Sequence, residues 1–382
     1  MASNGMSSGV TADADGHIME PGNLWKENLE PQYRDRAMQV VRGDNGLDYL
    51  EIDGSRSQVL DGALGFLGIL DEAAAWRSKE KKPELMNWED CRTPGSRDPH
   101  ARIDWMDAQG IDLAFLYPSL GLNWQTECGD AGLAAAYCRV YNDWIIDFCR
   151  PYPDRLIPIA MISLMEVDNG VEEVKRAARL GAKGVYMFPN PPVNGTPYGE
   201  EYYDPFWAEV EETGLPIGIH VSSTPRYVGH DLYKATFTSN GWWYGLMQKL
   251  DCQLAFTTFF HGGVFERFPR LKLGVVEAHC GWMPAWLDAM DSAMLREPDA
   301  KLLPSDYFKR QCWISGEPDE KAFSFTAQML GADRLVWGSD YPHGEGHTDP
   351  LAELKESIGN LPERDQRQII GENAVDLYGL AS

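Results

Sequence analysis

The chain has 382 residues, of which 43% are hydrophobic and 24% are charged. This balance supports a large core and excludes a disordered or fibrous protein, and the length suits one eight-fold β/α barrel with insertions. Asp and Glu number 58 against 34 Lys and Arg, which gives a formal net charge of −24. Such a charge disfavours nucleic acids and anionic membrane surfaces as partners, because both would be repelled.

Neither a membrane span nor a secretory signal is predicted. No run of 18 apolar residues occurs, and the N-terminal sequence MASNGMSSGV lacks both a basic start and an apolar stretch. The seven cysteines form no CxxC pair and are odd in number, which is typical of a compartment where thiols stay reduced. We therefore expect a cytoplasmic protein without disulfides or thiolate metal sites, and assembly into a homo-oligomer stays open.

Eight short apolar runs alternate with amphipathic stretches along most of the chain. The expected strands cover residues 10–15, 111–117, 155–163, 182–188, 216–221, 271–277, 311–315 and 334–340. Stretches of helical periodicity lie between them, for example at residues 132–150, 167–180 and 243–260. Strands that alternate with helices in this number predict an α/β fold, the closed (β/α)8 or TIM barrel.

Residues 22–98 do not share this rhythm, because they are rich in Pro, Gly and charged residues. The segment follows the first expected strand, so we predict a long insertion that forms a lid over the carboxyl ends of the strands. No linker, internal repeat or low-complexity tract divides the rest of the chain. Residues 1–382 are therefore predicted to form a single domain.

Polar residues collect where the expected strands end, and a β/α barrel places its active site at this edge. They are Asp15, His17 and Glu20 after the first strand, His220 at the fifth, Glu277 and His279 at the sixth, and Asp340 and His343 at the eighth. Asp15 and His17 are two residues apart, as are Glu277 and His279, so each pair is expected to leave its strand on one face and to reach one ion.

Carboxylates and imidazoles without thiolates favour zinc, manganese or non-haem iron as the bound metal. The eight candidate ligands exceed the needs of one ion, which favours two ions that use all of them. The alternative is one ion, with half of these residues hydrogen-bonded to its ligands. Asp13 is interpreted as such a buried partner, while His230 and His347, in predicted loops, either line the pocket or lie in solvent.

Four segments of the chain are similar to one known family: DADGHIMEP at 13–21, GVFERFPRLK at 263–272, GSDYPH at 338–343 and GENAVDLYG at 371–379. In these segments the sequence resembles the amidohydrolase-related barrels of the aminocarboxymuconate-semialdehyde decarboxylase type, from Ala12 to the C-terminus. The resemblance implies that His17, His220 and Asp340 bind a metal. It also implies that the end of the sixth strand supplies a ligand or an acid/base group.

The chain departs from these decarboxylases at two positions. They begin with His-x-His, whereas Asp15 stands at the first of these positions here, and Glu277 stands where they have a catalytic histidine. The His17-x-x-Glu20-Pro21 element, together with Glu277-x-His279-x-Gly-Trp282, resembles instead a branch that includes the barrel-fold non-haem diiron monooxygenases, such as that of platensimycin and platencin biosynthesis. This second resemblance implies two Fe ions, O₂ as co-substrate and an apolar, terpenoid-like substrate that coenzyme A could carry as a thioester.

We therefore predict a diiron monooxygenase, an oxidoreductase of secondary metabolism that hydroxylates an apolar small molecule. Asp340 and His279 are the expected acid/base residues of the site. Aromatic residues suited to an apolar substrate lie in the insertion or after strand ends, namely Trp25, Trp124, Trp242, Trp243, Tyr244, Trp282 and Trp286. The alternative is a hydrolase or a non-oxidative decarboxylase, in which one zinc or manganese ion polarises the substrate or activates water.

Overall fold

A sheet of eight parallel strands forms the centre of the molecule. The computed structural model describes residues 9–61, 64–68, 87–192, 195–224, 241–296, 301–344 and 346–380. The strands, neighbours in chain order, are β1 (Ala12–His17), β5 (Leu113–Tyr117), β6 (Leu156–Met161), β7 (Gly184–Met187), β8 (Ile217–His220), β9 (Leu273–Val276), β10 (Cys312–Gly316) and β11 (Leu335–Trp337). Each overlaps a strand expected from the sequence, so the predicted (β/α)8 fold is confirmed.

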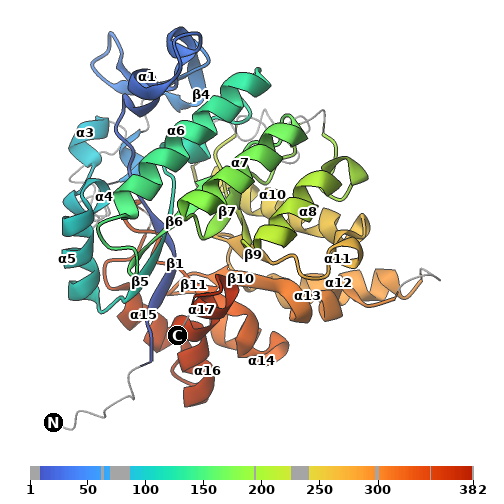
Figure 1. The fold of residues 1–382 in the computed structure, drawn as a ribbon. Coiled ribbons are helices and arrows are strands. Elements are labelled where there is room, and N and C mark those ends of the chain that lie inside the picture. The colour runs from blue at the N-terminus through green and yellow to red at the C-terminus, as the bar shows by residue number, and fades with distance from the viewer. Residues whose placement is uncertain are drawn as a thin grey trace, which may run out of the picture.

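Helices cover the outside of this sheet, as Figure 1 shows. They are α5 (Pro99–Gln109), α6 (Ala131–Cys149), α7 (Val167–Leu180), α8 (Asp204–Thr213), α10 (Gly241–His261), α11 (Val264–Arg267), α12 (Met283–Met294), α13 (Pro304–Gln311), α14 (Phe323–Leu330), α15 (Pro350–Ile358), α16 (Glu363–Arg367) and α17 (Asn373–Leu377). Local sequence sets several ends. Asp130 begins α6 because its carboxylate accepts from two backbone N–H groups, and Gly181 ends α7 in the left-handed conformation.

The first and last strands close the barrel through the backbone at their carboxyl ends. The N–H of His17 donates to the carbonyl of Tyr341 at 2.7 Å, and the N–H of Asp340 donates to the carbonyl of Asp15 at 2.9 Å. Gly338 lies so close to β1 that a Cβ atom there would collide with the Cβ of Asp15. A glycine is therefore required at this position, since a side chain would separate the two strands that carry the candidate ligands.

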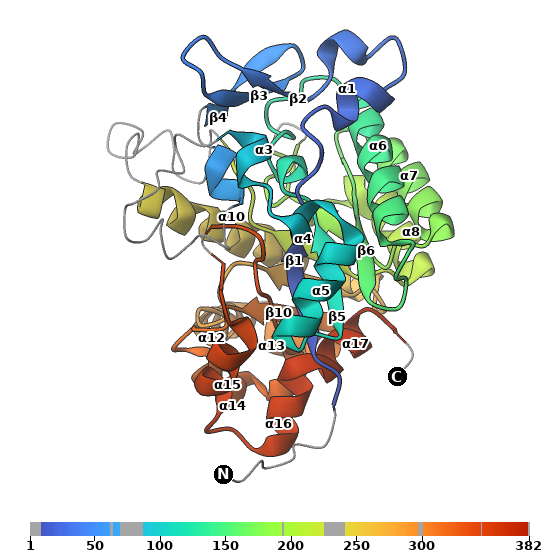
Figure 2. The ribbon, with the colours of Figure 1, turned by 90° about the vertical axis from the view of Figure 1, so that its left-hand side faces the viewer.

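The segment between β1 and β5 forms a small structure of its own. It contains α1 (Leu24–Asn28), an antiparallel sheet of β2 (Gln39–Arg42), β3 (Asp48–Ile52) and β4 (Ser55–Asp61), then α3 (Trp88–Cys91) and α4 (Pro94–Arg97). Asp53 and Gly54 join β3 to β4, and both have positive φ, as a two-residue turn between twisted strands requires. In Figure 2 the chain rises along β1 into this segment, which lies beyond the carboxyl end of that strand.

Replacing Gly338 with Ala should destabilise the protein by about 3 kcal/mol or more, because the backbone on the β1 side cannot yield to the added methyl group. Gly129→Ala is the matched control, since a Cβ atom there meets no atom within 4 Å. Urea unfolding followed by circular dichroism measures both variants. Equal stabilities for the two variants would contradict the close approach of β1 and β11.

Candidate metal centre

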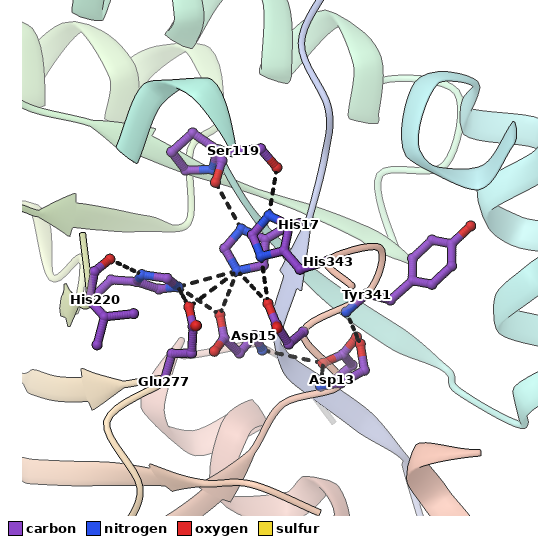
Figure 3. A network of polar contacts seen from close by, with 12 residues as sticks. Asp13, Asp15, His17, Ser119, His220, Glu277, Tyr341 and His343 are labelled. Carbon is purple, nitrogen blue, oxygen red and sulfur yellow. Dashed lines mark hydrogen bonds and ion pairs between the residues drawn. The ribbon is translucent and has the colours of Figure 1, made fainter. Parts of the chain in front are cut away.

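Six polar side chains converge at the carboxyl ends of β1, β8, β9 and β11 (Figure 3). They form two overlapping groups whose ligand atoms lie within 4.8 Å of one another. The first group is Asp15, His17, His220 and Glu277, and the second is His17, Glu277, Asp340 and His343. The structure therefore gathers six of the eight predicted ligands, and it leaves Glu20 and His279 outside the cluster.

Hydrogen bonds to the backbone determine which nitrogen of each central imidazole carries a proton. The Nδ1 atom of His17 lies 2.8 Å from the carbonyl oxygen of Pro118, and that of His220 lies 2.7 Å from the carbonyl oxygen of Val221. A carbonyl oxygen only accepts hydrogen bonds, so both Nδ1 atoms donate and the Nε2 atoms of the neutral rings present lone pairs. These two Nε2 atoms face each other at 3.3 Å.

Burial keeps His17 in the protonation state that binds a metal. Burial, with the neighbouring His343, lowers the pKa of His17 to about 3, so the ring is neutral at physiological pH. The carboxylate of Asp15 lies beside both rings, with Oδ1 3.1 Å from Nε2 of His220 and 3.4 Å from Nε2 of His17. Lone pairs and an anionic oxygen therefore point into the same buried space, and a cation is needed to offset their repulsion.

The spacing of the donor atoms fits one ion. The Nε2 atom of His220 lies 3.1 Å from Asp15 Oδ1 and 3.2 Å from Glu277 Oε2, and the Nε2 atom of His17 lies 3.5 Å from Asp340 Oδ1. Ligands that bind one ion at about 2.1 Å are about 3.0–3.5 Å apart when their angles are tetrahedral or octahedral. Two imidazoles and three carboxylates thus suit one divalent cation such as zinc or manganese.

The prediction of two iron ions has no support in this geometry. Both groups of donor atoms include His17, whose Nε2 atom has a single lone pair and can bind one ion. The two nitrogens of His343 also have other partners, because Nδ1 lies 2.7 Å from Asp340 Oδ1 and Nε2 lies 2.9 Å from Ser119 Oγ. The His343 ring is stacked on that of His17, with ring centroids 4.0 Å apart. It therefore links Asp340 to Ser119 and holds the Asp340 carboxylate in place.

Glu20 is buried but directed away from the cluster. Its carboxylate accepts hydrogen bonds from the backbone N–H groups of Ser119, Leu120 and Gly121, the nearest two at 2.9 and 3.0 Å. Burial raises the pKa of Glu20 to about 7, although these N–H groups oppose the shift. Glu20 thus orders the loop that carries Ser119, and the structure does not support its predicted role as a ligand.

His279 also lies outside the cluster, and the reason is the local backbone. Glu277 and His279 both have φ of 55°, so the strand ends before them and the alternation of side chains expected from their spacing does not hold. The Nδ1 atom of His279 lies 3.6 Å from Glu320 Oε2, and its side chain is 43% exposed. Asp340 has φ of 53°, and such strained residues concentrate at functional sites.

Two buried groups beneath the cluster support β1. Asp13 accepts from the N–H of Ser339 at 2.8 Å and from its hydroxyl at 2.7 Å, which ties β1 to the end of β11. Arg102 donates to the carbonyl of His17 at 2.7 Å, and its guanidinium lies over the ring of Tyr341. Asp13 therefore acts as the buried partner expected of it, whereas Arg102 and Ser119 were not predicted. Ser119 could have been found by its place after β5, but nothing local marks Arg102.

The remaining predicted pocket residues serve other contacts or lie outside the described residues. His347 is buried, with Nδ1 2.5 Å from Glu353 Oε2; burial lowers its pKa, but Glu317 and Glu353 outweigh this and raise it. Trp25 and Trp124 are fully buried against Tyr137 in the core. His230 and the side chains of residues 242–244 lie outside the described part of the chain.

None of the described helices combines the length and apolar character that a membrane span requires.

Comparison with known proteins gives a family and a set of relatives. A family model described as amidohydrolase matches residues 12–380. The 2-amino-3-carboxymuconate-6-semialdehyde decarboxylase of Dictyostelium discoideum is 27% identical over 292 residues, which are 74% of this chain and 77% of that protein. A γ-resorcylate decarboxylase of Rhizobium sp. is 27% identical over 261 residues, 63% of this chain and 76% of that protein.

Solved structures show the same fold. An amidohydrolase from Mycobacterium avium subsp. paratuberculosis has a TM-score of 0.80 at 23% identity and covers 98% of this chain and 100% of its own. A dihydroxybenzoic acid decarboxylase from Polaromonas sp. JS666, solved with manganese and the inhibitor 2-nitroresorcinol, has a TM-score of 0.66 at 18% identity and covers 98% of both chains.

These relatives contradict the predicted monooxygenase. The two curated relatives described above are decarboxylases, which are lyases, so the prediction of an oxidoreductase is wrong and that of two iron ions has no support. Neither O₂ nor a coenzyme A thioester has support as a partner, and the resemblance to the platensimycin branch is not upheld. The physical reason is that hard carboxylate and imidazole donors do not distinguish iron from manganese or zinc.

We expect the purified protein, loaded with Mn²⁺ and desalted, to retain one ion per chain. His220→Ala should weaken Mn²⁺ binding by more than about 100-fold, because it removes a ligand and leaves three carboxylates facing one another. Dialysis against graded Mn²⁺ concentrations followed by elemental analysis measures the affinity. His261→Ala is the control, because His261 is the last residue of α10 and is not one of the candidate ligands. Two ions per wild-type chain would contradict the single-ion geometry.

Glu20 should make folding less favourable as pH rises. Its folded pKa of about 7 exceeds the ordinary value of 4.5, so between these pH values the unfolded chain loses the proton while the folded chain keeps it. The stability of wild type relative to Glu20→Gln should therefore fall by on the order of 3 kcal/mol from pH 4.5 to 7, and level off above pH 7. Urea unfolding of both proteins across this range tests the sign, and a difference that grows with pH would refute it.

Proposed function

Because the chain belongs to the amidohydrolase family, we propose that it is a metal-dependent, non-oxidative decarboxylase of a small aromatic or unsaturated carboxylic acid. The observation that carries the proposal is the pair of Nε2 atoms of His17 and His220, which face each other at 3.3 Å among three carboxylates. The relatives support the reaction class, since both act as decarboxylases by name and γ-resorcylate is an aromatic acid.

We assign one divalent ion, manganese or zinc, to five ligands: Asp15, His17, His220, Glu277 and Asp340. The manganese of the Polaromonas decarboxylase supports the choice of metal. Such an ion would bind oxygen atoms of the substrate and draw electron density from the carbon that loses the carboxylate. The protein then has to hold the ligands rigidly, and it does so through Pro118, Val221 and His343.

The reaction needs a proton and no oxidant. Decarboxylation breaks the bond between a substrate carbon and its carboxylate carbon, CO₂ leaves without the bonding electron pair, and a proton takes its place on the carbon. The donor of this proton has to reach the substrate and cannot be occupied as a ligand. We assign this role to His279, whose side chain is 43% exposed, whereas that of Asp340 is 5% exposed and bonded to His343.

Glu320 orients the proposed proton donor. It faces Nδ1 of His279 at 3.6 Å and accepts hydrogen bonds from the backbone N–H groups of Cys280 and Gly281 at 2.9 and 2.7 Å. The buried carboxylate is therefore held still and leaves the Nε2 atom of His279 for the substrate. This arrangement resembles other enzymes in which a carboxylate sets the orientation of a catalytic imidazole.

We expect the Mn²⁺-loaded protein to release CO₂ from an aromatic acid under argon. A panel headed by 2,6-dihydroxybenzoate, the acid also named γ-resorcylate, is assayed by CO₂ evolution and by chromatography of the phenol product. A chelator should abolish turnover and Mn²⁺ should restore it, because the carboxylate cluster needs its cation. A requirement for O₂, or turnover unaffected by complete metal removal, would overturn the proposal.

His279→Gln should lower kcat by about 10²- to 10⁴-fold, which is the usual contribution of a positioned acid, and should leave metal content unchanged. His100→Gln is the control, because His100 is an exposed residue bonded to Tyr152. A normal kcat for His279→Gln would remove His279 from the mechanism. A loss of bound Mn²⁺ would instead make it a ligand.

A further inference from the structure

The charge of the metal centre raises a problem for an anionic substrate. Asp15, Glu277 and Asp340 contribute three negative charges, and imidazoles bind metals as neutral ligands, so a divalent ion would leave the cluster with a net charge of about −1. The whole chain, these three carboxylates included, carries a formal net charge of −24. A carboxylic acid is ionised at neutral pH, so a cation beyond the metal is required near the entrance to offset the repulsion.

The exposure of the cluster shows from which side a substrate reaches it. The side chains of His17 and His220 are fully buried, that of Asp15 is 3% exposed and that of Asp340 is 5% exposed. Glu277 is the most open of these ligands at 12%. Two residues further along the chain, His279 is 43% exposed. Glu277, at the end of β9, is therefore the most accessible of the five ligands, and we infer that a substrate enters from this side.

One lysine lies beside Glu277 and has no acidic partner among the residues that the structure describes. Lys249 comes from α10, and its Nζ atom donates a hydrogen bond to the backbone carbonyl of Glu277 at 3.3 Å. The ammonium has three N–H groups. Among the described residues, the carbonyl of Glu277 is the one group that accepts a hydrogen bond from it, and no carboxylate lies within ion-pair distance. The neighbouring Gln248 contacts Ser223 after β8, which places this turn of α10 at the strand ends.

Another cation near the strand ends is already neutralised. Arg92, from the segment after β1, lies 2.8 Å from Glu89 Oε2 and donates to the carbonyl of Met19 at 3.2 Å. Its charge therefore has a carboxylate partner, whereas that of Lys249 has none within the described residues. A partly buried ammonium without a counter-ion is unfavourable unless a ligand supplies one.

We propose that Lys249 is the residue that binds the carboxylate of the substrate at the entrance to the metal centre. This inference rests on the proposed function, and it adds the recognition group for the anionic end of the acid. The carbonyl of Glu277 orients the ammonium through one N–H, and the remaining N–H groups donate to the carboxylate as charge-assisted hydrogen bonds. Such a contact exists before the reaction begins, so it acts on substrate binding more than on kcat.

The test compares two ligands that differ only in the carboxylate, 2,6-dihydroxybenzoate and resorcinol, on Mn²⁺-loaded protein by isothermal titration calorimetry. Lys249→Gln should weaken binding of the acid by about 10- to 100-fold and should change binding of resorcinol less than about twofold, since only the acid loses a charged hydrogen bond. Lys249→Arg keeps the charge and should retain most of the affinity. In turnover, KM should rise by a similar factor with kcat little changed.

Lys272→Gln is the matched control, because Lys272 also donates to backbone carbonyls, those of Asp376 and Leu377 at 3.0 Å, but at the opposite end of β9. Metal content and thermal unfolding verify that every variant is folded and loaded. Equal losses for acid and resorcinol, or an equal effect of Lys272→Gln, would overturn the role of Lys249 and leave the decarboxylase proposal intact. A wild type that binds neither 2,6-dihydroxybenzoate nor benzoate would overturn both.

Discussion

Five potential metal ligands share one buried space in this molecule, and the rest of the site follows from that constraint. His17 and His220 turn their lone pairs toward each other because their Nδ1 protons are bonded to backbone carbonyls. Three carboxylates, from Asp15, Glu277 and Asp340, complete the ring of donors. Carboxylates and imidazole nitrogens brought this close at such burial repel one another, and a bound cation would offset that repulsion.

The barrel keeps these donors from moving apart. Arg102 bonds the carbonyl of His17, Asp13 bonds Ser339 beneath Asp340, and His343 links Asp340 to Ser119. Glu20 in turn holds the loop of Ser119 through backbone N–H groups. A donor that is tied to a neighbouring strand cannot relax away from its repulsive partners. The fold therefore holds the ligands in place before a metal binds, and a bound metal would relieve the repulsion between them.

The same donors explain why the reaction class was first predicted wrongly. Oxygen and nitrogen ligands of this kind suit manganese, zinc and iron alike, so their presence does not distinguish oxygen activation from decarboxylation. The number of candidate ligands favoured two ions, but the side chains of Glu20 and His279 contact other residues, although both lie near the ligands in sequence. Relatives named as decarboxylases contradict oxygen activation, and the geometry for one ion supports the proposed decarboxylation.

The sequence by itself determined the eight strands and the residues that follow them, because apolar runs and the parallel order of the barrel are local and repetitive properties. Asp15, His17 and His220 could be placed at one edge on this basis. Only the tertiary structure decided which side chains meet there. Left-handed conformations at Glu277 and His279 direct the side chain of His279 away from the cluster. The packing of α10 brings Lys249 beside Glu277. Periodicity describes the faces of one element, whereas these outcomes depend on backbone turns at strand ends and on contacts between distant elements.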